Sequence, residues 1–182
     1  IDRCLNTDGY ILGNICYISL LANLMKNNLT DEELIKFCNF YKKDGALEEY
    51  LRRLSDIDEN NFRSKYKLRT ENPFYSSYKQ RKKEAKKKNL PFTITLDYVE
   101  SIFPTNSLCP VLGVEMRKGS GSVKPYSPTL DKINPEMGYQ KGNITWVCSR
   151  ANTSKSCATQ QQLYNFCEFY KDGASKYITE TV

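Results

Sequence analysis

The 182-residue chain contains no histidine. The imidazole has an ordinary pKa close to neutral pH, so its absence excludes a histidine general base and histidine ligands for a metal. The sequence also lacks an apolar run of about 20 residues, so no membrane span is expected. No secretory signal is visible, and because the chain starts with Ile1 we expect a fragment or a processed product.

The chain has no C-x-x-C pair, although it has seven cysteines. Their odd number and spacing favour reduced thiols over a disulfide framework. Reduced thiols, buried or free, are typical of intracellular proteins, so we expect a reducing compartment. The cysteines lie at positions 4, 16, 38, 109, 148, 157 and 167.

Positive charge is concentrated in one short stretch. The net charge is +6, and residues 79–88 alone contain seven cations and one anion, so the rest of the chain sums to about neutral. A basic helix of this kind suits a phosphate backbone, and a solvated charged helix or a membrane-surface segment are the alternatives. The predicted nucleic-acid contacts here are Lys79, Arg81, Lys82, Lys83, Lys86, Lys87 and Lys88.

The sequence repeats itself. Residues 2–42 lie over residues 131–171 at a constant offset of 129 without a gap. The two segments share 16 of 41 residues, whereas unrelated segments of average composition would share roughly two or three. Nothing precedes the first copy that corresponds to residues 90–129. We therefore expect the end of one unit and all of a second.

The local patterns predict an α+β fold with three parts. In the second copy, residues 127–131 and 143–149 read as strands around a glycine-containing loop. A helix is expected from about Arg150 and another from Thr159, where T-Q-Q-Q is a capping box. The predicted divisions are a partial unit at 1–45, a helix and linker at 46–73, and a complete unit at 74–182.

The order strand, glycine loop, strand and helix resembles the ββα-metal fold of HNH and endonuclease VII-like nucleases, the His-Me finger group. The wider arrangement looks like that of the small HNH-like proteins common in bacteriophages. The resemblance depends on spacing, because Asn143 is followed by Cys148, Ala151, Asn152 and Lys155 at the family's intervals. It covers roughly residues 74–171 and part of 1–42, and it implies a metal-dependent nuclease fold.

The resemblance implies a role for each matching residue. Asp131 and Asn152 would hold one Mg²⁺ or Mn²⁺ ion against the scissile phosphate. Asn143 would hold the loop and orient the base, while Lys155, together with Arg150, would contact phosphate. Simpler interpretations are a turn or cap aspartate, a helix-cap asparagine, a loop-closing asparagine and a solvated lysine.

The sequence departs from the family at the base. The residue after the aspartate is Lys132, and Arg3 stands there in the first copy. A lysine accepts a proton near neutral pH only if its pKa is strongly depressed, and an arginine effectively never does. A cation at this position fits electrostatic stabilisation or binding, with metal-activated water or Tyr139 as the alternative source of base catalysis.

A second departure concerns the family's zinc knuckle. Two C-x-x-C pairs would hold zinc tetrahedrally, but here the pairs read Cys109/Leu112 and Cys148/Ala151. Half of the ligands are apolar, so we expect a hydrophobic plug and no zinc. Partial zinc binding through the two cysteines is the minor alternative.

Three hypotheses of function follow. The first is a phage-type endonuclease that hydrolyses DNA with a metal on Asp131 and Asn152, with RNA not excluded and the cytoplasm of an infected host as the location. The second is a nucleic-acid-binding module without catalysis. The third is an assembly component in which the two copies pack together or against a larger parent protein. The spacing of the two ligands favours the first, and the missing base favours the second.

Overall fold

This computed structural model describes residues 2–117 and 124–174 of the chain. These residues contain two short antiparallel hairpins and seven α-helices. Residue 1 of the predicted unit at 1–45, and residues 118–123 and 175–182 of the predicted unit at 74–182, lie outside the described residues. The mixed content is compatible with the expected α+β class. The strands are β1 (Asp2–Arg3), β2 (Ile15–Cys16), β3 (Pro128–Lys132) and β4 (Ile144–Cys148), and β1 pairs with β2 and β3 with β4. The helices are α1 (Leu20–Lys26), α2 (Asp31–Tyr41), α3 (Ala46–Ser55), α4 (Tyr75–Lys87), α5 (Leu96–Ser101), α6 (Ser149–Lys155) and α7 (Gln160–Tyr170), with a 3-10 turn at Pro135–Met137.

The sequence repeat is also a repeat of structure. Helices α1 and α6 have the same bounds once the offset of 129 is applied, and so do α2 and α7. The predicted capping boxes are confirmed. Thr30 accepts the backbone N–H of Glu33 while Glu33 accepts that of Thr30, and Thr159 and Gln162 do the same. These reciprocal bonds satisfy backbone donors that a helix start leaves unpaired, so each box fixes where its helix begins.

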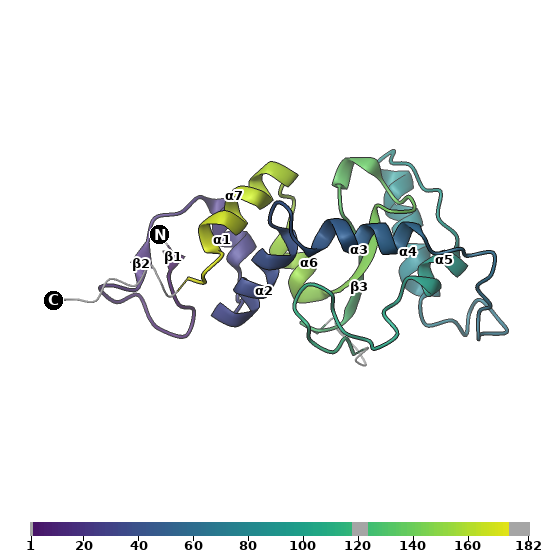
Figure 1. Ribbon diagram of the computed structural model, residues 1–182, viewed down its shortest axis with the longest axis horizontal. Helices are drawn as coiled ribbons and strands as arrows, with labels where there is room; N and C mark the ends of the chain where they lie inside the picture. The colour runs from purple at the N-terminus through teal and green to yellow at the C-terminus, as the bar shows by residue number, and fades with distance from the viewer. Residues whose placement is uncertain (1, 118–123, 175–182) are drawn as a thin grey trace.

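The two copies pack against each other through equivalent elements. Helix α2 lies against α7, and α1 lies against α6. Phe37 and Phe166, which are equivalent at the offset of 129, meet edge to face with their ring centroids 6.1 Å apart. Contact between equivalent residues relates the copies by an approximate two-fold axis, with the first hairpin toward one end of the elongated molecule and the second beyond α6 (Figure 1).

The link between the copies contributes to the core. The predicted helix after the first copy is confirmed as α3, whose Leu47 and Leu54 are buried. Tyr50 on this helix stacks edge to face on Phe40 of α2, and its hydroxyl lies 3.0 Å from the Thr145 hydroxyl of β4. Helix α3 therefore connects the first copy to the second hairpin by side-chain contacts as well as by the chain.

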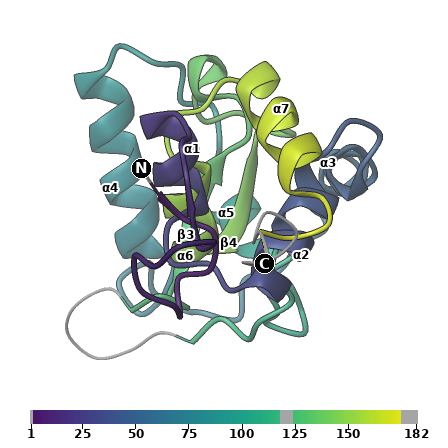
Figure 2. The same cartoon turned by 90° about the vertical axis from the view of Figure 1, so that its left-hand side faces the viewer.

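Residues 74–103 cover the second hairpin. Helix α4 packs on β3, and Phe92 forms a parallel bridge with Tyr139. The indole of Trp146 donates to the carbonyl of Val99 at 2.8 Å. Viewed along the long axis, α4 runs along one side of the molecule, opposite α3 (Figure 2). This cover, together with the α3 contact at Thr145, contributes to the burial of β4 along its whole length.

Within the described ranges, none of the helices has the length and apolar character needed to cross a bilayer. The longest of these helices, α4, spans 13 residues and contains the basic stretch except for Lys88, which is its C-cap. This agrees with the sequence, which shows no apolar run of about 20 residues.

Candidate functional site beside the second hairpin

Asn143 closes the loop between β3 and β4. Its side-chain oxygen accepts the backbone N–H of Asn134 at 2.9 Å, and its amide donates to the carbonyls of Asn134 and Gly138 at 3.0 and 2.7 Å. Asn14 makes the same three bonds to Leu5 and Gly9 in the first copy. The loop-holding role expected of Asn143 is therefore what these contacts perform.

Asp131 and Lys155 form one buried ion pair. Lys155 Nζ lies 2.9 Å from Asp131 Oδ2 and also donates to the backbone carbonyl of Lys132, and the two side chains are only 3% and 9% exposed. In the first copy Lys26 pairs with Asp2 at 3.1 Å and donates to a carbonyl at 2.7 Å in the same way. The aspartate and lysine retained in both copies thus connect the end of a strand to the end of a helix.

Lys155 does not lie where a surface phosphate contact was expected. Its ammonium group is buried against the protein's own carboxylate and carbonyl oxygens. Burial raises the pKa of Asp131, and the attraction of Lys155 opposes that rise. The lysine therefore acts as the internal counter-ion of Asp131.

As they lie, Asp131 and Asn152 do not fit a hard divalent cation. Mg²⁺ and Mn²⁺ need charged or carbonyl oxygens together with waters, but the Asp131 carboxylate is 8% exposed and already neutralised by an ammonium group. Asn152 is half-buried in α6. Across residues 2–117 and 124–174, no three acidic or cysteine side chains gather as a metal site would require.

Lys132 lies over an aromatic ring. Its Nζ is 4.9 Å from the ring centroid of Tyr139, and Arg3 stands 5.4 Å from the ring of Tyr10 in the first copy. A cation at this distance from a ring face is attracted by the ring quadrupole. The positive charge that both copies keep at the expected base position therefore has a structural partner in each.

The titration of this cluster disfavours Tyr139 as a base. Burial raises the pKa of Tyr139 to about 12, so the phenol is protonated at neutral pH, and its hydroxyl donates to Glu84 at 3.3 Å. Burial lowers the pKa of Lys132, as does the positive charge of Lys88, while Asp131 opposes the change. Cations from α4 and β3 therefore lie close enough to repel one another.

Helix α4 presents most of the predicted nucleic-acid contacts to solvent. Its one fully buried side chain is Ala85, and Tyr78 stacks on Phe92 to hold the helix against the second unit. Arg81 is partly buried and paired with Glu84 at 2.7 Å, so its charge is neutralised internally. The exposed lysines, none of which pairs with an acid within the described part of the chain, are Lys79, Lys82, Lys83, Lys86, Lys87 and Lys88.

Arg150 joins the two copies. Its guanidinium donates to both carboxylate oxygens of Glu33 at 2.9 and 2.8 Å and lies 3.3 Å from the hydroxyl of Tyr126. The Arg150 side chain is 20% exposed and that of Glu33 10% exposed. This arginine, expected to contact phosphate, instead forms an ion pair between the copies.

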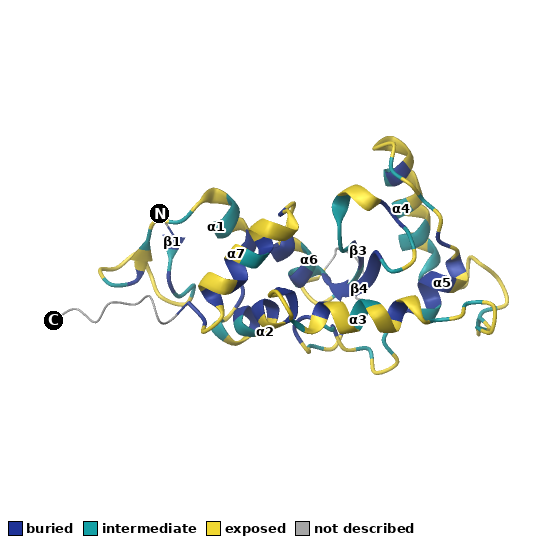
Figure 3. Ribbon diagram, turned by 45° about the horizontal axis from the view of Figure 1, so that its top comes forward, coloured by how far each residue is buried: buried dark blue, intermediate teal, exposed yellow. Residues whose placement is uncertain are grey.

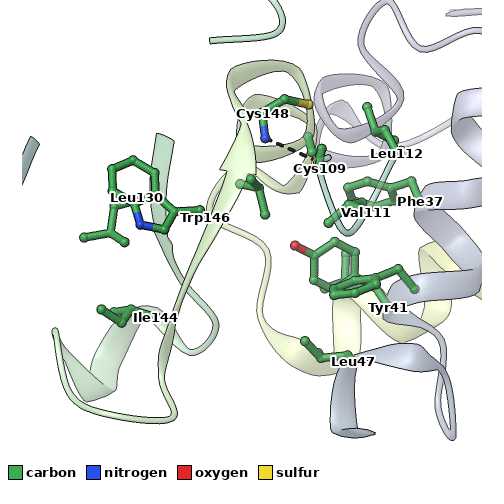
Figure 4. Packing of buried hydrophobic residues seen from close by; sticks show 14 of the residues in the cluster. Phe37, Tyr41, Leu47, Cys109, Val111, Leu112, Leu130, Ile144, Trp146 and Cys148 are labelled. Atoms are coloured by element: carbon green, nitrogen blue, oxygen red, sulfur yellow. Dashed lines mark hydrogen bonds between the residues drawn. The ribbon is translucent and has the colours of Figure 1, made fainter. Parts of the chain in front are cut away.

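The zinc-knuckle positions form an apolar cluster. Leu112 and Ala151 are fully buried beside Cys109 and Cys148, and Figure 4 shows Leu112 and Val111 close to α2. The sulfur of Cys109 accepts the backbone N–H of Cys148 at 3.3 Å. Its interaction with the Cys148 thiol lowers the pKa of Cys109 and raises that of Cys148. The expected hydrophobic plug is present.

Sequence reasoning missed two acids that determine which cations are available. Glu84 is the one acid in the basic stretch and lies three residues after Arg81, a spacing at which helical side chains meet. That signal could have identified Arg81 as paired. Glu33 gave no such signal, because its partner Arg150 is 117 residues away.

Comparison with known proteins gives no relative. No protein-family model matches the chain, and neither a curated protein nor a solved structure does.

Proposed function

We propose that the protein binds nucleic acid through the lysine face of α4, defined as Lys79, Lys82, Lys83, Lys86, Lys87 and Lys88. The observation that supports this most directly is that these lysines are exposed on α4 or, for Lys88, at its C-cap, and have no acidic partner within the described residues. Lysines on a fixed helix suit the regularly spaced charges of a phosphate backbone. DNA is the proposed ligand.

A merely solvated helix is the weaker interpretation. Like charges three and four residues apart destabilise a helix, and α4 has one acid, which Arg81 already neutralises. The helix is held instead by Ala85 and by the contact of Tyr78 with Phe92. Packing that keeps unpaired lysines together favours a surface that meets a polyanion.

The arrangement supports binding without hydrolysis. The metal-dependent endonuclease that the HNH-like resemblance implies remains a hypothesis, because Lys155 would have to leave Asp131 before that carboxylate could hold a cation. The finer assignment of a ββα-metal unit belongs to the same hypothesis. The positive charge of Lys132 near Lys88, the C-cap of α4, supports binding of phosphate next to the hairpin.

Fluorescence anisotropy with a short DNA duplex tests the proposal. We expect the triple variant Lys82→Gln, Lys83→Gln, Lys86→Gln to bind more weakly and to reduce the slope of log affinity against log salt by roughly 2 to 3. The matched control, Lys36→Gln, Lys42→Gln, Lys43→Gln, removes the same charge from positions of the first copy and the turn after it. An equal loss in both variants, or no binding by the parent, would sink the proposal.

Two further measurements separate the other candidates. A structured RNA in place of the duplex tests the ligand class, and tighter binding of RNA would replace DNA as the proposed partner. A plasmid-nicking assay with Mg²⁺ or Mn²⁺ tests the endonuclease hypothesis. Nicking that is abolished by Asp131→Asn in a folded variant would establish metal-dependent cutting.

A further inference from the structure

Large apolar side chains are exposed together on the first copy. They come from β2, the loop before it and α1, the region at one end of the molecule where exposed residues gather in Figure 3. We call this the first-copy apolar face, and its residues are Tyr10, Ile11, Leu12, Ile15, Tyr17, Leu20 and Leu24. Large apolar side chains left exposed in one region of a protein are typical of a surface that meets another protein.

The second copy shows how the equivalent positions are covered. Tyr17 is 86% exposed, whereas its equivalent Trp146 is 1% exposed. Trp146 is enclosed by the rings of Phe74 and Phe103, at centroid distances of 5.3 and 5.8 Å. The same segment covers Tyr139, the equivalent of Tyr10. The ring of Phe92 stacks on that of Tyr139 with centroids 5.6 Å apart.

A groove beside this face is also filled in one copy and open in the other. The open groove, of volume ≈ 490 Å³, lies between α1 and α7 and is lined by Tyr17, Ala22, Phe166 and Tyr170 among others. The approximate two-fold axis relates these residues to Trp146, Ala151, Phe37 and Tyr41. In the second copy, Val111 and Leu112 of the knuckle lie beside Phe37 and Tyr41, while Trp146 lies on the other side of β4 (Figure 4).

A retained glycine gives an independent indication. A Cβ on Gly138 would collide with the carbonyl oxygen of Pro91, so the covering segment requires glycine there. At Gly9, the equivalent position, the nearest atom is 4.0 Å away and the φ angle is not in the left-handed range. Gly9 therefore has no need to be glycine in this structure, but it would if a backbone approached as Pro91 does.

The differences between the copies favour a protein occupant. Where the second copy has the partly buried Gln140 and Ser149, the first has Ile11 and Leu20. The first copy is thus the more apolar one at positions that it leaves exposed. A surface that stayed in water would gain nothing from these replacements, whereas a surface buried by a partner would.

We propose that the first-copy apolar face and the adjoining groove bind a partner polypeptide through a segment built like residues 74–113 of this chain. The segment places an extended stretch beside Gly9 and Tyr10, aromatic side chains around Tyr17, and a short apolar turn in the groove between α1 and α7. Binding completes the first copy as residues 74–113 complete the second.

A tethered probe tests this surface. Residues 72–130 are fused ahead of Asp2 in place of Ile1, which reproduces the spacing of the second copy, and Tyr17→Trp reports on the face with the buried Trp146 as the internal reference. We expect the added tryptophan to be open to acrylamide in the unfused chain. In the fusion its emission shifts to shorter wavelength and its quenching falls to the level of Trp146. An added tryptophan that stays as accessible in the fusion would overturn the proposal.

Matched controls distinguish this docking from other causes. Gly9→Ala leaves the quenching of the unfused chain unchanged, because the site is open. In the fusion, we expect Gly9→Ala to restore quenching of the added tryptophan. If quenching is not restored, the assigned position of the segment is wrong. Sedimentation of the unfused Tyr17→Trp chain tests a second copy as the occupant, and a dimer in which the added tryptophan is already protected would overturn the proposal. If the fusion unfolds, a synthetic peptide of residues 74–113 is added to the unfused chain. Saturable protection of the added tryptophan then supports the proposal, and an absence of protection rejects it.

Discussion

The ion pair of Asp131 and Lys155 explains why both residues recur in the two copies. A buried carboxylate without a partner is costly, and a buried ammonium likewise. The pairing at 2.9 Å and the bond from Lys155 to a strand carbonyl satisfy both groups, and Lys26 and Asp2 form the equivalent ion pair in the first copy. Recurrence of an aspartate at a metal-ligand position can therefore reflect folding instead of catalysis.

Removing one partner of this pair should destabilise the protein strongly. We expect Lys155→Met to lower the free energy of unfolding by about 3–5 kcal/mol, because it leaves the Asp131 carboxylate buried and unpaired. The double variant Asp131→Asn, Lys155→Met removes both charges and should recover part of that loss. Urea denaturation measures both, and a Lys155→Met protein as stable as the parent would contradict the pairing.

Tyr139 should contribute to loss of stability at high pH. Its folded pKa is raised to about 12 by burial, above the ordinary value of about 10. A raised pKa means that the stabilising contribution is present below pH ~10 and is lost as the pH rises through the folded value. We expect the free energy of unfolding of Tyr139→Phe to fall less with increasing pH between these two pKa values than that of the parent. Denaturation midpoints across the alkaline range measure this, and identical pH profiles would contradict it.

At the scale of elements, the β3–β4 loop of the second unit lies close against the stretch before α5. Gly138 has φ +72° and faces the carbonyl of Pro91. Backbone bonds join Tyr139 to Pro91 and Thr93 to Tyr139, at 2.8 and 3.0 Å. The segment that covers the hairpin is thus joined to the hairpin by backbone hydrogen bonds. This close approach requires a glycine at position 138.

Gly138→Ala and Gly9→Ala form a matched pair. We expect Gly138→Ala to destabilise by more than ~1 kcal/mol, since alanine is strained at positive φ and its Cβ would collide with Pro91. Gly9→Ala should change the thermal midpoint little or raise it slightly. Thermal unfolding followed by circular dichroism compares the two, and equal effects would show that the close approach does not constrain the fold.

At the scale of the molecule, two copies that began as equivalents have become different. Arg150 of the second copy pairs with Glu33 of the first, whereas the position equivalent to Arg150 is Leu21. The position equivalent to Glu33 is Gln162, whose side chain caps its helix. Because neither Leu21 nor Gln162 carries a charge, the inter-copy ion pair occurs on one side of the approximate axis alone.

Arg150→Leu, which introduces the residue of the first copy, should weaken the contact between copies. We expect a loss of about 1–2 kcal/mol, between the values for exposed and buried ion pairs, because both side chains are largely covered. Arg53→Leu, at an exposed pair with Glu49, is the control and should leave the urea midpoint nearly unchanged. A double-mutant cycle with Glu33→Gln isolates the pair, and a coupling free energy near zero would contradict its role.

The sequence by itself determined the duplication, the capping boxes at Thr30 and Thr159, and the basic helix, because caps, helical periodicity and runs of charge act within a few residues. Only the tertiary structure decided which charges remain available. Lys155 meets Asp131 from 24 residues away and Arg150 meets Glu33 from 117 away. Burial and pairing over such separations depend on how the copies pack, and local patterns do not specify that packing.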